Sequence, residues 1–255
     1  MASFFVALAI GLTTGLILAL VGGGGSILTV PALLYLLGMS IGPATTTSLV
    51  VVGANAAFGA WRVYRRNGLS VLRVDYGVAL GLSGLIGTQV GNWLNHTLPA
   101  QVTLLGFALL MLAVAIPMLR PPRLETKNAE ISKPGANWLK VGLIGLGLGF
   151  LTGLFGVGGG FLIVPALTLL LGFPMRQASA TSLLVIFINS LSALLGRWPL
   201  DGLDWGLLAA LLVGGVTGTW LGGNLGHKLA DKKLRQIFAW LVVIIGVYIA
   251  WQALK

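Results

Sequence analysis

The sequence Val21–Leu37, VGGGGSILTVPALLYLL, places four consecutive glycines inside an apolar run, with Pro31 six residues after the last of them. A second copy, VGGGFLIVPALTLLL, occupies Val157–Leu171, and its Pro165 follows Pro31 by 134 residues. The same offset relates several polar positions: Thr47 to Thr181, Ser48 to Ser182, and Asn55 to Asn189. A repeat of about half the chain length indicates that the chain is built from two related halves.

The composition is that of an integral membrane protein. Of the 255 residues, 56% are hydrophobic and only 9% are charged, and the mean hydropathy is +0.96. A soluble domain carries about 25% charged residues, so this chain could not cover a globular surface with polar groups. The net charge of +10 is better explained by basic loops on the cytoplasmic side of a membrane than by nucleic-acid binding. The absence of cysteine excludes disulfides, thiolate metal sites and thiol nucleophiles.

The apolar segments predict an all-α polytopic membrane protein. The first apolar run is too long for one span, which needs about 20 residues, so the glycines divide it into a long and a short arm. We expect these arms at Ser3–Leu20 and Ser26–Leu37, and their counterparts at Trp138–Phe155 and Gly160–Leu171. The short arms either span fully or re-enter, which gives about eight to ten membrane segments. Three further helices are expected in each half: Ala44–Trp61, Tyr76–Trp93 and Ala100–Leu119, then Ala178–Leu195, Trp205–Leu221 and Leu234–Trp251.

The long polar segment at residues 120–137 divides the chain. It is rich in proline and charge, and we predict that it is a flexible linker. It would join a first membrane repeat, residues 1–119, to a second membrane repeat, residues 138–255, within one integrated transport domain.

Positive charge predicts how the two halves insert. If each glycine-centred run is a hairpin that returns to its own side, the strongly basic loops after Trp61, Leu119 and Leu221 fall on one side. If each run is a single span, the last of these loops falls opposite the first. Only the hairpin arrangement satisfies the positive-inside rule. It places the N-terminus outside and the 120–137 linker in the cytoplasm, and it makes the halves inverted-topology repeats, a common plan of secondary transporters.

The glycine tips are the first candidate site. Broken helices at membrane depth are tolerated where they are buried in protein or line a cavity. Backbone N–H groups and helix N-termini, from Ser26 and from Gly160 onward, would then attract an anion without a basic side chain. Gly24, Gly25, Gly158 and Gly159 would supply the backbone contacts. The structural alternative is close helix packing through small residues.

Polar residues on the helix after each tip form the second part of the candidate site. Ser48 and Asn55 are seven residues apart and share a helix face, and Ser182 and Asn189 repeat this spacing. Neutral donors suit an oxyanion, which accepts hydrogen bonds and need not be neutralised. The alternative for the asparagines is hydrogen bonding between helices.

Residue types that are missing from the spans exclude other functions. All six acidic residues lie in loops or at span ends, so a carboxylate proton relay is not expected. The two histidines, His96 and His227, lie near span ends and do not form a metal site. Without a buried nucleophile–base pair or metal cluster, we expect no enzyme and no cofactor. Arg62, Arg66 and Arg197 could attract anions at the mouths of a route, but headgroup anchoring is the simpler explanation.

The segments GGGGSILTVPALLYLLGMSIGPATTTSL and GVGGGFLIVPALTLLLGFPMRQASATSL resemble the TauE/SafE family of sulfite exporters, also called TSUP. The resemblance covers both halves and implies an inner-membrane transporter that exports sulfite or an organosulfonate such as sulfoacetate. It carries over these positions: Gly22, Gly23, Gly24, Gly25, Pro31, Thr47 and Ser48, then Gly156, Gly158, Gly159, Gly160, Pro165, Thr181 and Ser182. The two half-sites are unequal, because Ser26 stands opposite Gly160, Gly23 opposite Val157, and Arg176 opposite Gly42.

We therefore expect a secondary transporter that moves a small sulfur-containing anion outward by alternating access, with the anion between the two glycine tips. Its expected partners are the substrate and the lipid bilayer, and the oligomeric state stays open. The alternative is a transporter or channel for another small anion, such as a carboxylate. The full set of expected substrate-binding residues is Gly22, Gly23, Gly24, Gly25, Ser26, Thr47, Ser48, Asn55, Gly156, Gly158, Gly159, Gly160, Thr181, Ser182 and Asn189.

Overall fold

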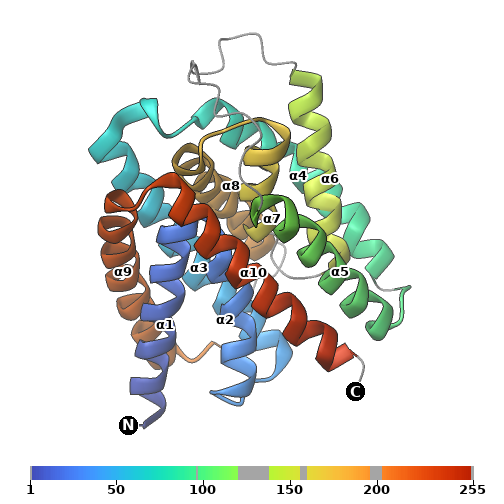
Figure 1. Cartoon of the computed structure of the whole chain (residues 1–255). Helices are drawn as coiled ribbons and strands as arrows, with labels where there is room; N and C mark the ends of the chain where they lie inside the picture. Colours follow the sequence, from blue (N-terminus) through green and yellow to red (C-terminus); the bar gives the residue numbers. More distant parts are fainter. Residues whose placement is uncertain (1, 96, 120–137, 156–159, 196–202, 254–255) are drawn as a thin grey trace.

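The computed structural model describes residues 2–95, 97–119, 138–155, 160–195 and 203–253, and the regular elements in these ranges are all helical (Figure 1). In the first half they are α1 (Ala2–Val21), α2 (Gly24–Tyr35), α3 (Ile41–Asn67), a 3₁₀ turn (Gly68–Ser70), α4 (Val74–Asn95) and α5 (Ala100–Leu119). In the second half they are α6 (Trp138–Phe155), α7 (Gly160–Pro165), a π-helical turn (Ala166–Leu170), α8 (Met175–Leu195), α9 (Trp205–Lys228) and α10 (Asp231–Ala253). The predicted 120–137 linker lies outside the described residues.

Length and hydropathy confirm an all-α polytopic membrane protein. Within the described residues, six helices are long and apolar enough to cross a membrane, namely α1, α5, α6, α8, α9 and α10. Helices α3 and α4, of 27 and 22 residues, have the length of a span but are less apolar. The arms α2 and α7 are much shorter, as the sequence predicted.

The predicted helix boundaries hold best where apolar residues meet a clear stop. Helices α5 and α6 have the predicted limits, whereas α3 runs six residues past Trp61 to Asn67. Arg62, Arg65 and Arg66 therefore lie on the last turns of a helix and not in a loop. The reason is physical: basic residues do not end a helix, and α3 ends where Gly68 adopts a φ of +63°.

Two glycine-lined seams hold the closest-packed helices together. A Cβ atom built on Gly15 of α1 would lie 2.9 Å from the carbonyl carbon of Gly215 of α9. A Cβ atom on Gly149 of α6 would lie 2.6 Å from the carbonyl carbon of Gly84 of α4. The backbones themselves are thus in contact, which is the usual use of small residues between membrane helices.

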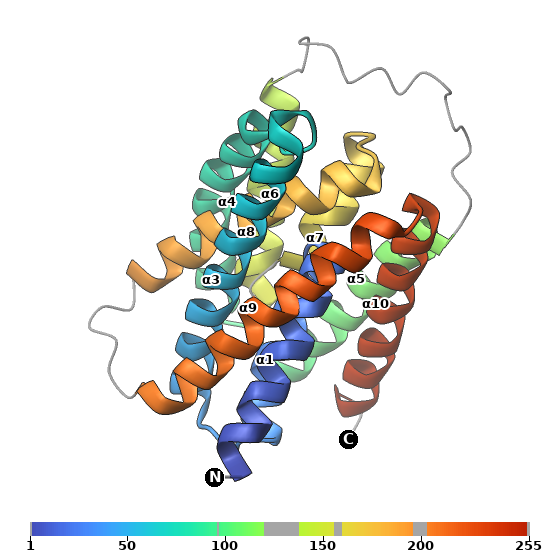
Figure 2. The ribbon, with the colours of Figure 1, turned by 90° about the vertical axis from the view of Figure 1, so that its left-hand side faces the viewer.

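The contacts between helices follow a pattern that is unchanged when the two halves are exchanged. Helix α1 packs on α9 as α6 packs on α4, and α5 packs on α10 (Figure 2). Helix α3 also packs on α8, and α2 packs on α7. Each helix of one half therefore contacts a helix of the other, and the halves interleave.

The two short arms are built differently. Every residue of α7 is buried, and Phe161 packs edge-on against Phe107 of α5 with ring centroids 5.3 Å apart. After Pro165 the helix widens into a π-helical turn, whereas α2 accommodates Pro31 without this change. The start of the second arm is therefore central, and both arms end at the surface, with Tyr35 68% and Leu170 53% exposed.

Candidate functional site

The first glycine tip joins α1 to α2 and depends on Gly22. Its φ of +80° lies in the left-handed region that favours glycine. A Cβ atom on Gly22 would also lie 2.5 Å from the Cα atom of Ser179 on α8. Glycine is thus required here both by the backbone turn and by packing against the other half.

Two serines of α8 hold this tip in place. The Ser179 hydroxyl donates to the carbonyl oxygen of Val21 at 3.1 Å, and the Ser182 hydroxyl donates to the carbonyl oxygen of Gly22. Ser182 also donates to the Ser179 carbonyl oxygen at 2.8 Å. These hydroxyls satisfy carbonyl groups that the end of α1 leaves unpaired. Ser182, expected to face the substrate, contacts the tip itself in this conformation.

The first tip meets the start of α7 inside the fold. A Cβ atom on Gly23 would lie 2.8 Å from the carbonyl carbon of Gly160 and 3.0 Å from the Cα atom of Phe161. Gly23 and Gly160 are both buried. Gly25 packs instead on α1, where a Cβ atom would lie 2.8 Å from that of Leu18, and Gly24 is the first residue of α2. The remaining tip positions, Gly156, Gly158, Gly159 and the side chain of Ser26, lie outside the described residues.

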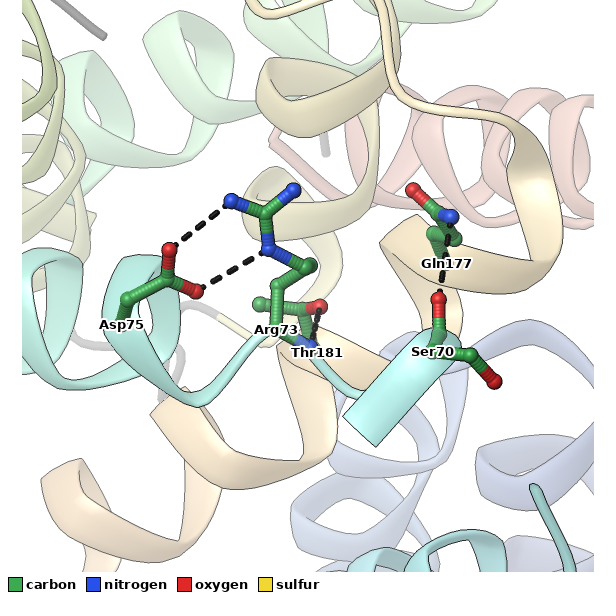
Figure 3. Close-up of polar contacts among 5 residues, drawn as sticks. All are labelled: Ser70, Arg73, Asp75, Gln177 and Thr181. Carbon is green, nitrogen blue, oxygen red and sulfur yellow. Dashed lines mark hydrogen bonds and ion pairs between the residues drawn. The ribbon is translucent and has the colours of Figure 1, made fainter. Parts of the chain in front are cut away.

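Most of the polar side chains predicted on α3 and α8 are buried: Thr47, Ser48, Asn55, Thr181 and Ser182. Thr181 ties α8 to the connection between α3 and α4, because its hydroxyl oxygen accepts the backbone N–H of Arg73 at 3.3 Å (Figure 3). Beside it, the amide of Gln177 donates to the carbonyl oxygen of Ser70. Thr181 therefore has a role in holding the two halves together.

The same connection carries an ion pair. Asp75 accepts hydrogen bonds from the Arg73 guanidinium, the shorter at 2.8 Å (Figure 3). This hydrogen bond raises the pKa of Arg73. The pair joins the α3–α4 connection to the first turn of α4.

The two predicted asparagines carry buried oxygen atoms without a hydrogen-bond partner among the described residues. This holds for Oδ1 of Asn55, which is 1% exposed, and for Oδ1 of Asn189. Asn55 lies against α9, since a Cβ atom on Gly215 would lie 2.6 Å from its Oδ1 atom, and Asn189 lies on α8. A buried acceptor without a partner is unfavourable, and a bound water or ligand would relieve it.

A basic cavity of about 140 Å³ lies between the ends of α3 and α9 and the start of α8. Arg62, Arg66 and Arg176 line it, and the latter two are exposed and mark its mouth. Its deepest polar residues are Ser179 and Thr219, which are 8% and 1% exposed. Because Ser179 also bonds Val21, the cavity ends beside the first glycine tip.

The sequence interpretation treated Arg62 and Arg66 as headgroup anchors and missed this cavity. The signal was their spacing: residues four apart share one face of a helix. The sequence interpretation overlooked this signal because it took the segment as a loop, and in a loop residues four apart do not share a face.

Comparisons with known proteins agree over nearly the whole chain. A family model described as "Sulfite exporter TauE/SafE" matches residues 7–249. A Xylella fastidiosa (strain 9a5c) protein named "Probable membrane transporter protein" is 34% identical, over 98% of this chain and 96% of the relative. The "Probable membrane transporter protein YunE" of Bacillus subtilis (strain 168) is 27% identical over 99% of both chains.

Proposed function

Because the chain belongs to the TauE/SafE family of membrane transporters, we propose that it exports a small sulfur-containing anion by alternating access. The substrate class is sulfite or an organosulfonate such as sulfoacetate, and the location is the cytoplasmic (inner) membrane of the cell. Like the members of its family, the chain is a membrane transporter and not an enzyme. As a multi-pass membrane protein its second partner is the lipid bilayer.

The observation that carries this proposal is the buried contact between Gly23 and Gly160. It brings the start of α2 and the start of α7, one from each half, to one point. Helix starts present unpaired backbone N–H groups and a partial positive charge, which suit an anion. Ser48 and Ser182, together with Thr47 and Thr181, would add hydroxyl groups, and the asparagines would add amide donors after rotation of their side chains.

The exchange symmetry of the contacts supports the proposal of alternating access. We infer that the halves are inverted repeats, with the N-terminus outside and the 120–137 linker inside. The close glycine contacts would make α1 with α9, and α4 with α6, two rigid helix pairs. In alternating access these pairs would rotate relative to each other about the α3–α8 contact. The serine contacts to the tip would then form in one state and break in the other.

Transport by the purified protein tests the proposal. Proteoliposomes loaded with labelled sulfite, sulfoacetate, sulfate or acetate should release a sulfur-containing anion faster than protein-free liposomes. A Gly23→Val variant, which forces the tips apart, should lose this flux. Absence of flux for every anion would overturn the proposal.

The alternative is another small anion, such as a carboxylate, or a channel-like route. The arginine-lined cavity supports this alternative, because guanidinium groups bind carboxylates as well as sulfonates. Competition between acetate and sulfoacetate separates the substrates. Saturation of the flux with concentration separates a carrier from a channel.

A further inference from the structure

Building on the proposed function, we propose that Arg62 and Arg66 form an entry site for a small oxyanion, which binds in the basic cavity before it reaches the first glycine tip. The ligand class is an anion with at least two acceptor oxygens, such as sulfite or a sulfonate.

Arg62 is held in position by helix α9. Its guanidinium donates to the carbonyl oxygen of Trp220 at 2.6 Å and to Oδ1 of Asn224 at 2.7 Å. It also lies over the Trp220 ring, 5.5 Å from the centroid. Gly223 makes room for it, because a Cβ atom there would lie 2.7 Å from Nη1 of Arg62. The group is therefore preorganised, so little side-chain freedom is lost when an anion binds.

Arg66 brings a second positive charge to the same point. Its guanidinium donates to the same Asn224 oxygen at 3.3 Å. Neither Arg62 nor Arg66 forms an ion pair with a carboxylate among the described residues. Arg176, the third arginine on the cavity, does pair with Asp231 at 3.1 Å. Two guanidinium groups that share a neutral acceptor leave a net positive charge, and an oxyanion would neutralise it with charge-assisted hydrogen bonds.

The far end of the cavity leads to the proposed transport site. Thr219 and Ser179 lie at its buried end, and the Ser179 hydroxyl contacts the Val21 carbonyl oxygen at the tip. The cavity between the arginines and the tip thus carries these two hydroxyl groups among apolar side chains such as Leu20, Val63 and Leu183. By the predicted topology, this end of α3 faces the cytoplasm, the side from which an exporter loads.

A lipid phosphate shares the chemistry of the proposed ligand. Trp220, which Arg62 contacts, and Trp61, which precedes Arg62 in α3, are both about half exposed, and tryptophan favours the membrane interface. The binding experiment must therefore separate a soluble anion from a headgroup. Nanodiscs of phosphatidylcholine alone and of phosphatidylcholine mixed with phosphatidylglycerol provide the two arms.

The experiment is calorimetric titration of the full chain in nanodiscs with sodium sulfite and with sodium ethanesulfonate. In phosphatidylcholine nanodiscs the wild-type protein should bind at least one of the two anions. Arg66→Gln should weaken binding about tenfold, or about 1.4 kcal/mol, because it removes one charge-assisted hydrogen bond to the anion. Asn224→Asp places a carboxylate between the guanidinium groups and should abolish binding while keeping the fold.

Arg65→Gln is the matched control. Arg65 lies on the same turn of α3 but does not line the cavity; it contacts the Trp61 ring instead. This variant removes the same charge and should keep the Kd within about twofold of wild type. An equal increase in Kd for Arg65→Gln and Arg66→Gln would overturn the entry site, because the anion would then respond only to the overall positive charge of this surface.

Measuring both anion binding and anion flux separates failure of the entry site from failure of the proposed transport function. Binding that requires Arg66, with no flux of any anion, supports the entry site and overturns the transport proposal. Flux with unchanged Kd and KM in Arg66→Gln and Asn224→Asp overturns the entry site alone. If phosphatidylglycerol binds in an Arg66-dependent way but neither soluble anion does, the site belongs to lipid and the entry role is overturned.

Discussion

Comparing Gly22→Ala with Gly38→Ala separates two reasons for glycine at the first tip, the positive φ of the backbone and the close contact with α8. Gly38 provides the matched control, because it also has a positive φ, +64°, but a Cβ atom there would meet nothing within 4 Å. At Gly22 the Cβ atom would lie 2.5 Å from Ser179 Cα and 2.6 Å from Ser182 Oγ. Both substitutions impose the same backbone strain, and only one forces the tip from its partner.

The expected magnitudes follow from these two terms. A non-glycine residue in the left-handed region costs about 1–2 kcal/mol. Overpacking of a tight contact adds about 1–3 kcal/mol. Gly38→Ala should therefore cost only the first term, and Gly22→Ala both. The difference would shift the equilibrium between docked and separated tips about 5- to 150-fold.

Two measurements check this prediction on the same preparations. Thermal unfolding in detergent should show a lower Tm for Gly22→Ala than for Gly38→Ala, by about 2–4 °C for each kcal/mol of difference. Anion flux in proteoliposomes should fall for Gly22→Ala and stay near wild type for Gly38→Ala. Equal loss of Tm and equal flux in the two variants would refute the reasoning, because the contact with α8 would then contribute nothing.

Three further predictions concern the seams, the serine contact and the topology. Gly149→Leu should prevent α6 from packing on α4 and reduce the yield of monodisperse protein, whereas Gly147→Leu, where a Cβ atom meets nothing within 4 Å, should be tolerated; similar yields would contradict the seam. Ser182→Ala should lower the Tm by a few degrees, since a lost hydrogen bond costs about 1 kcal/mol, and weaken flux in folded protein; unchanged flux would remove this hydroxyl from the site. The chain has no cysteine, so Thr97→Cys and Lys232→Cys are unique labels. An impermeant maleimide should reach the first only from outside and the second only from inside, and the reverse result would invert the predicted orientation.

The sequence was sufficient for the elements of the fold. Helices α5 and α6 begin and end as predicted, because each is an apolar segment of span length with a clear stop after it, Arg120 after α5 and a glycine-rich sequence after α6. The glycine breaks were equally clear, and α2 begins at Gly24 within the predicted glycine run. The error at the end of α3 arose because charged residues were taken as a loop signal, although arginine is a good helix former.

The candidate site was less accessible to sequence reasoning. The burial of Ser48 and Asn55 could be expected from their spacing on a membrane helix. The partner of Ser182 could not, because its hydroxyl meets a carbonyl oxygen 160 residues away in the chain. The same holds for Arg62, whose acceptor at Trp220 is 158 residues away.

The sequence by itself determined that the chain is a multi-pass helical membrane protein with two glycine-broken segments related by a repeat. Composition, segment length and internal repetition are properties of the linear chain, and the bilayer admits few structures that satisfy them. Only the tertiary structure decided that Gly23 meets Gly160 and that Arg62 and Arg66 line a cavity. These depend on which helix backbones can approach one another, and packing of the glycine seams in three dimensions sets that approach.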